Sequence, residues 1–337
     1  MKTHIFTFLF FVGLFSSIVS CDNNSDLPVT TSDKPLNLDS LIVLNPDSVP
    51  LLVERGENNF KEYNHDLAMV DASRAFRLDS NNLSARLLYA QILNNRENRS
   101  LSDIIAAQRH YKIIVKKQPK NTTALVGLAS TFLFQQDFEK TFQYVNEALR
   151  VDQKYRDAYV LKGTAYLMLK NKELAKSSYE TAIQRDPEFF AAYFILGQIY
   201  QSEDNPVCVE YFTTAHELEP NNLEVKYQVA FTRETYGQIE GAKEMYREMT
   251  KDTSELYVSR GLFHQGNLHR GEKNIDSALY FFKSAIETNP KYVEAWYNLG
   301  LCHQSKGDRE KALKAYSNCL KFDPEFTLAR ERANEIR

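Results

Sequence analysis

The segment EAWYNLGLCHQSKGDREKALKAYSNCLKFDPEF, residues 294–326, contains the only tryptophan of the chain and a regular spacing of small, aromatic and proline residues. The positions that define this spacing are Gly300, Ala312, Tyr316 and Pro324. About 34 residues earlier they are matched by Gly266, Ala278, Phe282 and Pro290. Further upstream the same positions hold Gly163, Ala175, Tyr179 and Pro187. The segment is therefore one copy of an internal repeat.

Each copy has the spacing of two α-helices separated by a turn. In the last copy, the residues three or four positions apart are Trp296, Leu299, Gly300 and His303 in the first half, and Ala312, Tyr316 and Cys319 in the second. The sequence SKGD between them is typical of a turn. Pro324 ends the second helix because proline lacks a backbone donor and disfavours helical geometry in the residue before it. The pattern predicts a helical hairpin that buries its apolar faces only by stacking on neighbouring hairpins.

This hairpin pattern resembles the tetratricopeptide repeat (TPR) family over most of the chain. About eight units, beginning near residues 49, 83, 122, 156, 189, 223, 259 and 293, follow the family period. The resemblance implies an all-α TPR solenoid, a right-handed superhelix of about eight helical hairpins. We expect the array to cover residues 49–326 and residues 327–337 to form a C-terminal capping helix. A non-repetitive helical bundle is the alternative, which the recurrence disfavours.

The N-terminal sequence MKTHIFTFLFFVGLFSSIVSC, residues 1–21, has the features of a secretory signal. A lysine precedes an apolar run that is too short and too interrupted for a good membrane span, and small residues lead to Cys21. Residues 18–21 resemble the bacterial lipobox, in which the cysteine becomes lipidated. We therefore expect a lipoprotein signal peptide at residues 1–20 and a lipid anchor on Cys21. An ordinary signal peptide followed by an unrelated cysteine is the alternative.

The segment after the cysteine has the composition of a linker. It contains several prolines together with Asp, Asn and Ser, and it shows little helical periodicity. Residues 21–48 are therefore predicted to form a flexible tether, whose LIVL cluster could dock on the first repeat. The expected location is the cell envelope, where the lipid anchors the protein to a membrane, with the outer membrane favoured. Asp22 and Asp26 are compatible with retention at the inner membrane in some bacteria and with surface export in others, so the membrane face stays open.

Composition and polar residues favour a binding protein over an enzyme. A net charge of -3 gives no basic surface for nucleic acid. No catalytic triad, phosphate-binding glycine loop or catalytic carboxylate pair stands out, so we expect no enzyme activity, no cofactor and no metal site. His269 and His303 occupy equivalent places in consecutive repeats, but earlier repeats have tyrosine there. Cys208, Cys302 and Cys319 are interpreted as small apolar packing residues, with a disulfide between the last two as the alternative.

The resemblance also indicates which surface binds partners. In the family, one stripe of each first helix lines the concave groove of the superhelix. In this sequence the stripe is aromatic in the C-terminal half, whereas earlier repeats have Val126 and Val160 there. A ligand with apolar side chains and a carboxylate suits this half. The candidate partner-binding residues are Phe194, Tyr227, Phe231, Arg260, Phe263, Asn267, Arg270, Tyr297 and Asn298.

Two alternatives concern this stripe. Regularly spaced aromatic rings also pack on one another to stiffen a superhelix, and the sequence does not separate packing from binding. In addition, Asn267, Asn298 and Arg332 match residues with which some family members hold the C-terminal carboxylate of a partner. In this chain Phe263 and Leu328 stand where that clamp has lysines, which weakens the match.

The sequence therefore predicts a membrane-anchored TPR lipoprotein that acts as a protein–protein interaction scaffold or adaptor in the bacterial cell envelope. Its expected partner is a protein or peptide segment bound in the concave groove. The alternative is a surface lipoprotein that binds a nutrient glycan on a helical repeat frame. Proteins of that kind carry long insertions around the sugar site, whereas the loops between the repeats of this chain are short.

Overall fold

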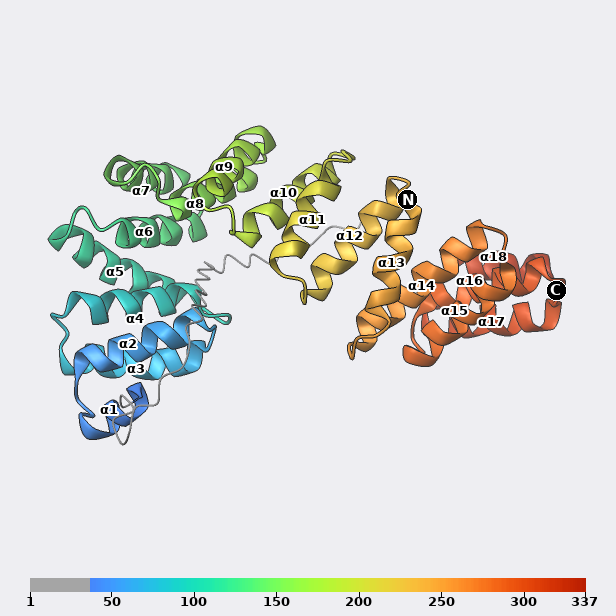
Figure 1. Ribbon diagram of the computed structural model, residues 1–337, viewed down its shortest axis with the longest axis horizontal. Coiled ribbons are helices and arrows are strands. Elements are labelled where there is room, and N and C mark those ends of the chain that lie inside the picture. Colours follow the sequence, from blue (N-terminus) through green and yellow to red (C-terminus); the bar gives the residue numbers. More distant parts are fainter. Residues whose placement is uncertain (1–36) are drawn as a thin grey trace, which may run out of the picture. The chain divides into compact units, whose positions relative to one another are not determined.

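The computed structural model describes residues 37–337, and within this range the chain forms eighteen α-helices and no strand (Figure 1). The predicted all-α class is confirmed. The chain divides into two compact units, one ending at Ala192 and one running from Tyr193 to Arg337. Cys21 and the predicted signal peptide lie outside the described residues.

The first unit begins with the short helix α1 (Leu38–Leu44) and continues as helical hairpins. These pair α2 (Val49–Lys61) with α3 (His65–Leu78), α4 (Leu83–Asn95) with α5 (Leu101–Lys117), α6 (Thr122–Phe134) with α7 (Phe138–Val151), and α8 (Arg156–Met168) with α9 (Lys172–Arg185). The second helix of each of the first three hairpins also packs on the first helix of the next one, so the apolar faces form a continuous core.

The second unit repeats this arrangement. Its hairpins pair α10 (Phe190–Ser202), which begins in the first unit, with α11 (Cys208–Leu218), α12 (Leu223–Thr235) with α13 (Ile239–Met249), α14 (Glu255–Gly271) with α15 (Ile275–Thr288), and α16 (Val293–Ser305) with α17 (Arg309–Phe322). Helix α18 (Thr327–Glu335) follows the last hairpin. Residues 37–337 thus contain eight hairpins, in agreement with the sequence prediction of about eight.

Asparagine side chains define the start of many helices. The side-chain oxygen of an asparagine at the N-cap accepts a hydrogen bond from the backbone N–H three residues later, which satisfies a donor that the helix itself leaves free. This cap precedes α4, α6, α9, α12 and α15, at Asn82, Asn121, Asn171, Asn222 and Asn274. The repeat therefore specifies its helix boundaries locally.

Glycines of the first helices set the distance between the helices of a hairpin. A Cβ built on Gly300 would lie 2.4 Å from Cε1 of Tyr316, and one built on Gly163 would lie 2.8 Å from Cε2 of Tyr179. Both tyrosines lie on the second helix of the same hairpin and are fully buried. Gly197 and Gly266 face Phe212 and Phe282 in the same way. The recurrent glycine–ring pair is thus a close helix–helix contact.

Residues 38–44 differ from the sequence prediction. They fall within the predicted tether, but they form helix α1, which begins after Asn37 as N-cap. Ile42 is buried in one cluster with Leu52 of α2, and Arg55 of α2 bonds the carboxylate of Asp39 at 2.8 Å. The prediction of a flexible tether is therefore wrong for these residues, whereas the predicted docking of the LIVL cluster on the first repeat is confirmed by the burial of Ile42 against α2. A helix of 7 residues is marginal alone, and its contacts with α2 supply the missing stability.

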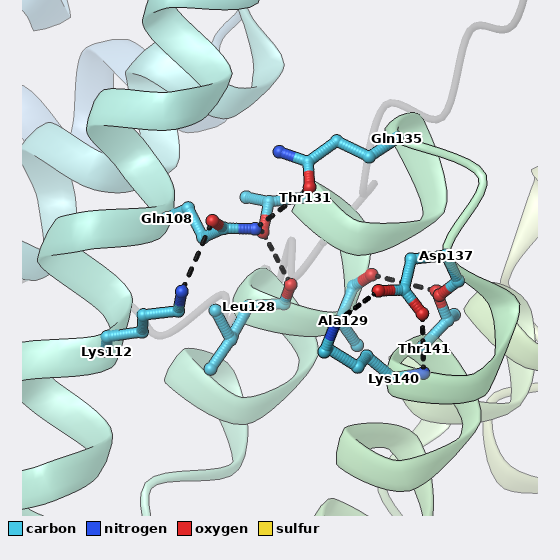
Figure 2. A network of polar contacts seen from close by, with 9 residues as sticks. All are labelled: Gln108, Lys112, Leu128, Ala129, Thr131, Gln135, Asp137, Lys140 and Thr141. Carbon is cyan, nitrogen blue, oxygen red and sulfur yellow. Dashed lines mark hydrogen bonds and ion pairs between the residues drawn. The ribbon is translucent and has the colours of Figure 1, made fainter.

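Buried polar groups in the first unit are satisfied by a network that joins α5, α6 and α7 (Figure 2). The buried hydroxyl of Thr131 donates to the carbonyl of Leu128 at 2.7 Å and accepts from the amide of Gln108 at 3.3 Å. The buried hydroxyl of Thr141 donates to the carbonyl of Asp137 at 2.8 Å. Because each hydroxyl has a partner, these polar side chains are compatible with the core.

Helix α18 covers the last hairpin as predicted for residues 327–337. Ala329 and Ala333 are buried against Ala312, Tyr316 and Cys319 of α17. Their small side chains let α18 lie close to α17. Among residues 37–337, no helix is both long and apolar enough to cross a membrane.

Candidate partner-binding surface

An aromatic row runs along the first helices of the second unit. It consists of one ring from each of α10, α12, α14 and α16, namely Phe194, Tyr227, Phe263 and Tyr297. All four side chains are half-buried. Each therefore combines contacts within the fold with surface that stays open to solvent, which is the property required of a residue that anchors a partner.

The buried side of the row packs on rings of the hairpins. Phe194 lies edge-on to Phe212 with ring centroids 5.7 Å apart. The Phe263 ring lies 4.8 Å from that of Tyr292, and the Tyr297 ring lies 5.2 Å from that of Phe326. These contacts fix the orientation of the rings, so the packing role considered from the sequence is present. Rings held in this way lose little conformational entropy when a partner binds.

Arg260 extends the row with a positive charge. Its guanidinium carbon lies 5.0 Å from the ring centroid of Tyr227 on α12 and 5.6 Å from that of Tyr257 on α14. Both distances are in the range of cation–π attraction. The hydroxyl of Tyr257 donates to Glu224 of α12 at 2.9 Å, which ties α14 to the preceding first helix. Arg260 therefore has a defined position between two consecutive first helices.

A polar cluster joins Glu234 of α12 to Tyr246 of α13 and His264 of α14. The carboxylate of Glu234 accepts from the Tyr246 hydroxyl at 2.7 Å and lies 2.8 Å from Nδ1 of His264. Nε2 of His264 lies 3.2 Å from the hydroxyl of Tyr227. Burial raises the pKa of Glu234, but the hydrogen bond and charge of His264, together with the Tyr246 hydroxyl, outweigh it and set this pKa below its usual value. The cluster holds the row residue Tyr227 in place.

Glu234→Gln is expected to destabilise the protein more at neutral pH than in acid. The folded-state pKa of Glu234 is below the ordinary value of 4.5, so its stabilising contribution is present above that pH and is lost as the pH falls through the folded-state pKa. We expect a loss of about 1 to 2 kcal/mol at pH 7 and a smaller loss at pH 3, measured by denaturant unfolding. Glu244→Gln, at an exposed position of α13, is the control. Equal losses for Glu234→Gln at the two pH values would exclude this role.

The remaining candidate partner-binding residues differ in their burial and contacts. Phe231 stacks on Tyr227 with ring centroids 6.0 Å apart, and Asn267 is half-buried on α14. Arg270 is exposed near the end of α14. Asn298 is buried, and its amide donates to the carbonyl of Glu294 at 2.8 Å.

Two residues of the alternative carboxylate clamp, Asn298 and Arg332, already have partners inside the fold. The side-chain amide of Asn298 is engaged with the backbone of its own helix. The guanidinium of Arg332 bonds the carboxylate of Glu335 at 2.8 Å. Holding a partner's carboxylate at this place would require both contacts to be exchanged.

The histidines and cysteines considered from the sequence have packing environments. His269 stacks on Phe281 at 5.2 Å, and His303 is buried. Within residues 37–337, no three His, Cys, Asp or Glu side chains are grouped so that they could hold a metal ion. Cys302 and Cys319 are buried free thiols, so the alternative disulfide is not formed. Burial raises the pKa of Cys302 to about 11, which favours the protonated thiol.

Sequence reasoning missed three residues of this surface: His264, Tyr246 and Tyr257. All three bond carboxylates of α12 from later helices. The sequence gives little indication of their role. His264 lies at the repeat position that holds Asn298 in the next repeat, and Tyr246 lies at the position where the second helix of a hairpin usually has an aromatic ring.

Two hairpins of the described array match family models. Residues 157–189 and residues 293–326 each match a model of the tetratricopeptide repeat, and they correspond to α8–α9 and α16–α17. Both hairpins are tetratricopeptide repeats, so the chain contains repeats of this family. Repeats of this family are typical of protein–protein interaction scaffolds.

Known relatives resemble the chain over part of their length. Human tetratricopeptide repeat protein 6 is 25% identical over 195 residues, which are 56% of this chain and 36% of that protein. Human protein O-mannosyl-transferase TMTC3 is 21% identical over 218 residues, which are 64% of this chain and 24% of that protein. The chain therefore spans about a third or less of these relatives. A thermophilic TPR protein of Thermus thermophilus has 17% identity and a TM-score of 0.49, with 55% of this chain and 98% of that chain covered.

Proposed function

We propose that the protein is a lipid-anchored adaptor of the bacterial cell envelope that binds a segment of a partner protein on the aromatic row. The row is the observation that supports binding, because it presents one half-buried ring from each of four consecutive first helices. An extended or helical segment that lies across these helices would contact several rings at once, and a few such anchors supply most of the energy of a protein interface.

Binding in the absence of catalysis is part of this proposal. The polar cluster around Glu234 is closed by its own partners, and the hydroxyl of Tyr246 keeps its proton because burial and the adjacent carboxylate raise its pKa. Such a cluster stabilises the contact between two hairpins and presents no activated nucleophile. The mannosyl-transferase named among the relatives, TMTC3, is matched by this chain over only 24% of its length.

The proposed anchor rests on the sequence around Cys21. We expect Cys21→Ser to abolish metabolic labelling with a fatty acid and to release the protein from the membrane fraction, because the cysteine carries the acyl chains. Ser20→Ala keeps a small residue before the cysteine and should leave labelling and fractionation unchanged. Membrane association that persists after removal of residues 1–20, or in Cys21→Ser without label, would refute the lipid anchor.

The partner class is tested with the intact protein. Affinity purification from solubilised membranes, followed by mass spectrometry, should recover a protein whose yield depends on the row residues. A glycan bound on an array, with no protein that depends on the row, would favour the nutrient-binding alternative instead.

A further inference from the structure

Arg260 is a cation on the candidate surface without an acidic partner in the described structure. No carboxylate of residues 37–337 forms an ion pair or a hydrogen bond with its guanidinium, whose contacts are with the faces of Tyr227 and Tyr257. The side chain is half-buried, so part of its hydration is lost on folding. The other three first helices of this unit have Ala191, Glu224 and Glu294 at the corresponding position of the repeat. The charge is therefore a feature of this one place in the row.

Two acidic residues of α12 in this region bond to other donors. One oxygen of Glu224 accepts from the amide of Gln228 at 2.8 Å, and the other accepts from the hydroxyl of Tyr257 at 2.9 Å. Glu234 accepts from Tyr246 and is bonded to His264. Neither carboxylate forms an ion pair with Arg260, and the bonds to Tyr257 and from His264 to Tyr227 fix the rings on which Arg260 lies. The guanidinium is thus held in place with its N–H donors not used by a carboxylate of the described chain.

A fixed guanidinium whose N–H donors are not used by a carboxylate of the described chain is suited to bind a carboxylate of another molecule. Its planar fork of N–H donors matches the two oxygens of an Asp or Glu side chain, and such charge-assisted bonds are stronger than neutral ones. Phe231 and Phe263 flank the same place, because Phe231 stacks on Tyr227 and Phe263 follows Arg260 by one helical turn. A phosphate would bring about two negative charges close to Glu224, which makes a single carboxylate the better match.

We propose that Arg260 receives a carboxylate of the bound segment, from an Asp or Glu side chain that neighbours an apolar residue placed on Phe231 or Phe263. This inference rests on the proposed function, since it names the chemistry of the segment that the aromatic row binds. Arg260 is distinct from the residues of the carboxylate clamp, Asn267, Asn298 and Arg332. It recognises an acidic side chain within a segment and does not require a free C-terminus.

The test uses the full-length protein and an array of twelve-residue peptides. Each peptide carries one Glu flanked by aliphatic or aromatic residues and is paired with the peptide of the same sequence that has Gln in place of Glu. We expect the protein to bind the best Glu peptides about tenfold or more tightly than their Gln counterparts, since charge-assisted hydrogen bonds are lost in the latter. Arg260→Gln should abolish this preference, and Arg260→Lys should restore part of it by returning the charge without the fork.

Arg247→Gln is the matched control because it removes one exposed arginine from α13 of the same unit and should leave the Glu preference unchanged. The melting temperature of each variant shows whether it is folded. Binding of Glu and Gln peptides with equal affinity, or a Glu preference that survives in Arg260→Gln, would overturn the role of Arg260 while leaving the aromatic row as a binding surface. A preference for phosphoserine over Glu would overturn the choice of carboxylate. Failure to bind any peptide, together with partner capture that does not depend on the row, would overturn both proposals.

Discussion

Replacement of both Phe263 and Tyr297 by alanine should reduce capture of the partner by tenfold or more. The two residues lie at corresponding places of consecutive first helices and are both half-buried. Loss of one anchoring side chain from an interface costs about 2 kcal/mol or more, which is more than a tenfold change in affinity. The measurement is the yield of each co-purified partner, followed by the dissociation constant of the strongest one.

This result must be separated from a loss of folding, because both rings also pack inside the fold. Phe263 contacts Phe282 at 5.9 Å and Tyr297 contacts Tyr316 at 5.9 Å, so the double variant should also melt at a lower temperature. Capture is therefore measured below that temperature, with circular dichroism to verify helicity. Tyr280→Ala is the control, since this ring on α15 is 65% exposed and lies outside the row. A folded double variant that retains its partners would show that the row has only a packing role.

Gly300→Leu should cause the largest loss of stability of the changes considered. The first added carbon would lie 2.4 Å from the Tyr316 ring, well inside van der Waals contact. The ring cannot easily retreat, because it is fully buried and its hydroxyl donates to Gln304 at 2.7 Å. Overpacking of this kind costs about 1 to 3 kcal/mol, and the remaining atoms of leucine place this variant at the upper end of that range. Chemical denaturation measures the change in the free energy of unfolding.

Gly271→Leu is the matched control for this substitution. Gly271 is the last residue of α14 and is exposed, and a Cβ at this position would meet no atom within 4 Å. The same replacement there should leave the free energy of unfolding almost unchanged. If the two leucine variants unfolded at the same denaturant concentration, the close approach of α16 and α17 would not be the reason for the glycine.

The hairpin fold was predictable because the two residues of its main helix–helix contact, a glycine and an aromatic ring, recur at a fixed spacing in the sequence. Gly163 faces Tyr179 and Gly300 faces Tyr316, so a small residue and a ring at this distance specify two closely packed helices. Prolines and N-cap asparagines mark the helix ends, and both act through backbone chemistry within a few residues. These are local signals, which a single sequence displays fully.

Contacts between different hairpins were harder to predict. Gly127 on α6 receives the ring of Tyr111, which lies on the second helix of the preceding hairpin, in place of a ring from its own α7. Its position in the repeat differs from that of Gly163, and spacing within one repeat contains no information about this contact. Helix α1 was missed for a related reason. The seven residues lack the length for a periodic signal, and their helix depends on contacts with Leu52 and Arg55.

The candidate surface also combines features that the repeat spacing predicts with contacts between hairpins that it does not. The aromatic row follows from the repeat spacing, since corresponding positions of successive first helices must share a face. The polar contacts of Glu234 with His264 and Tyr246 join α12 to later helices, and they depend on the register between hairpins. The lack of an acidic partner for Arg260 is likewise visible only when the bonds made by Glu224 are known.

The way in which α18 covers α17 bears on self-association. Repeats that stack on their neighbours present, at an open end, the same kind of surface that a further copy would use, so uncovered arrays are prone to grow into filaments. Here Ala329 and Ala333 occupy that surface, while Arg330 and Glu331 on the same helix are exposed to solvent. A second array that approached this end would meet charged side chains with strong hydration in place of an apolar stripe. Helix α18 thus covers the apolar face of α17 on which a further hairpin would otherwise stack.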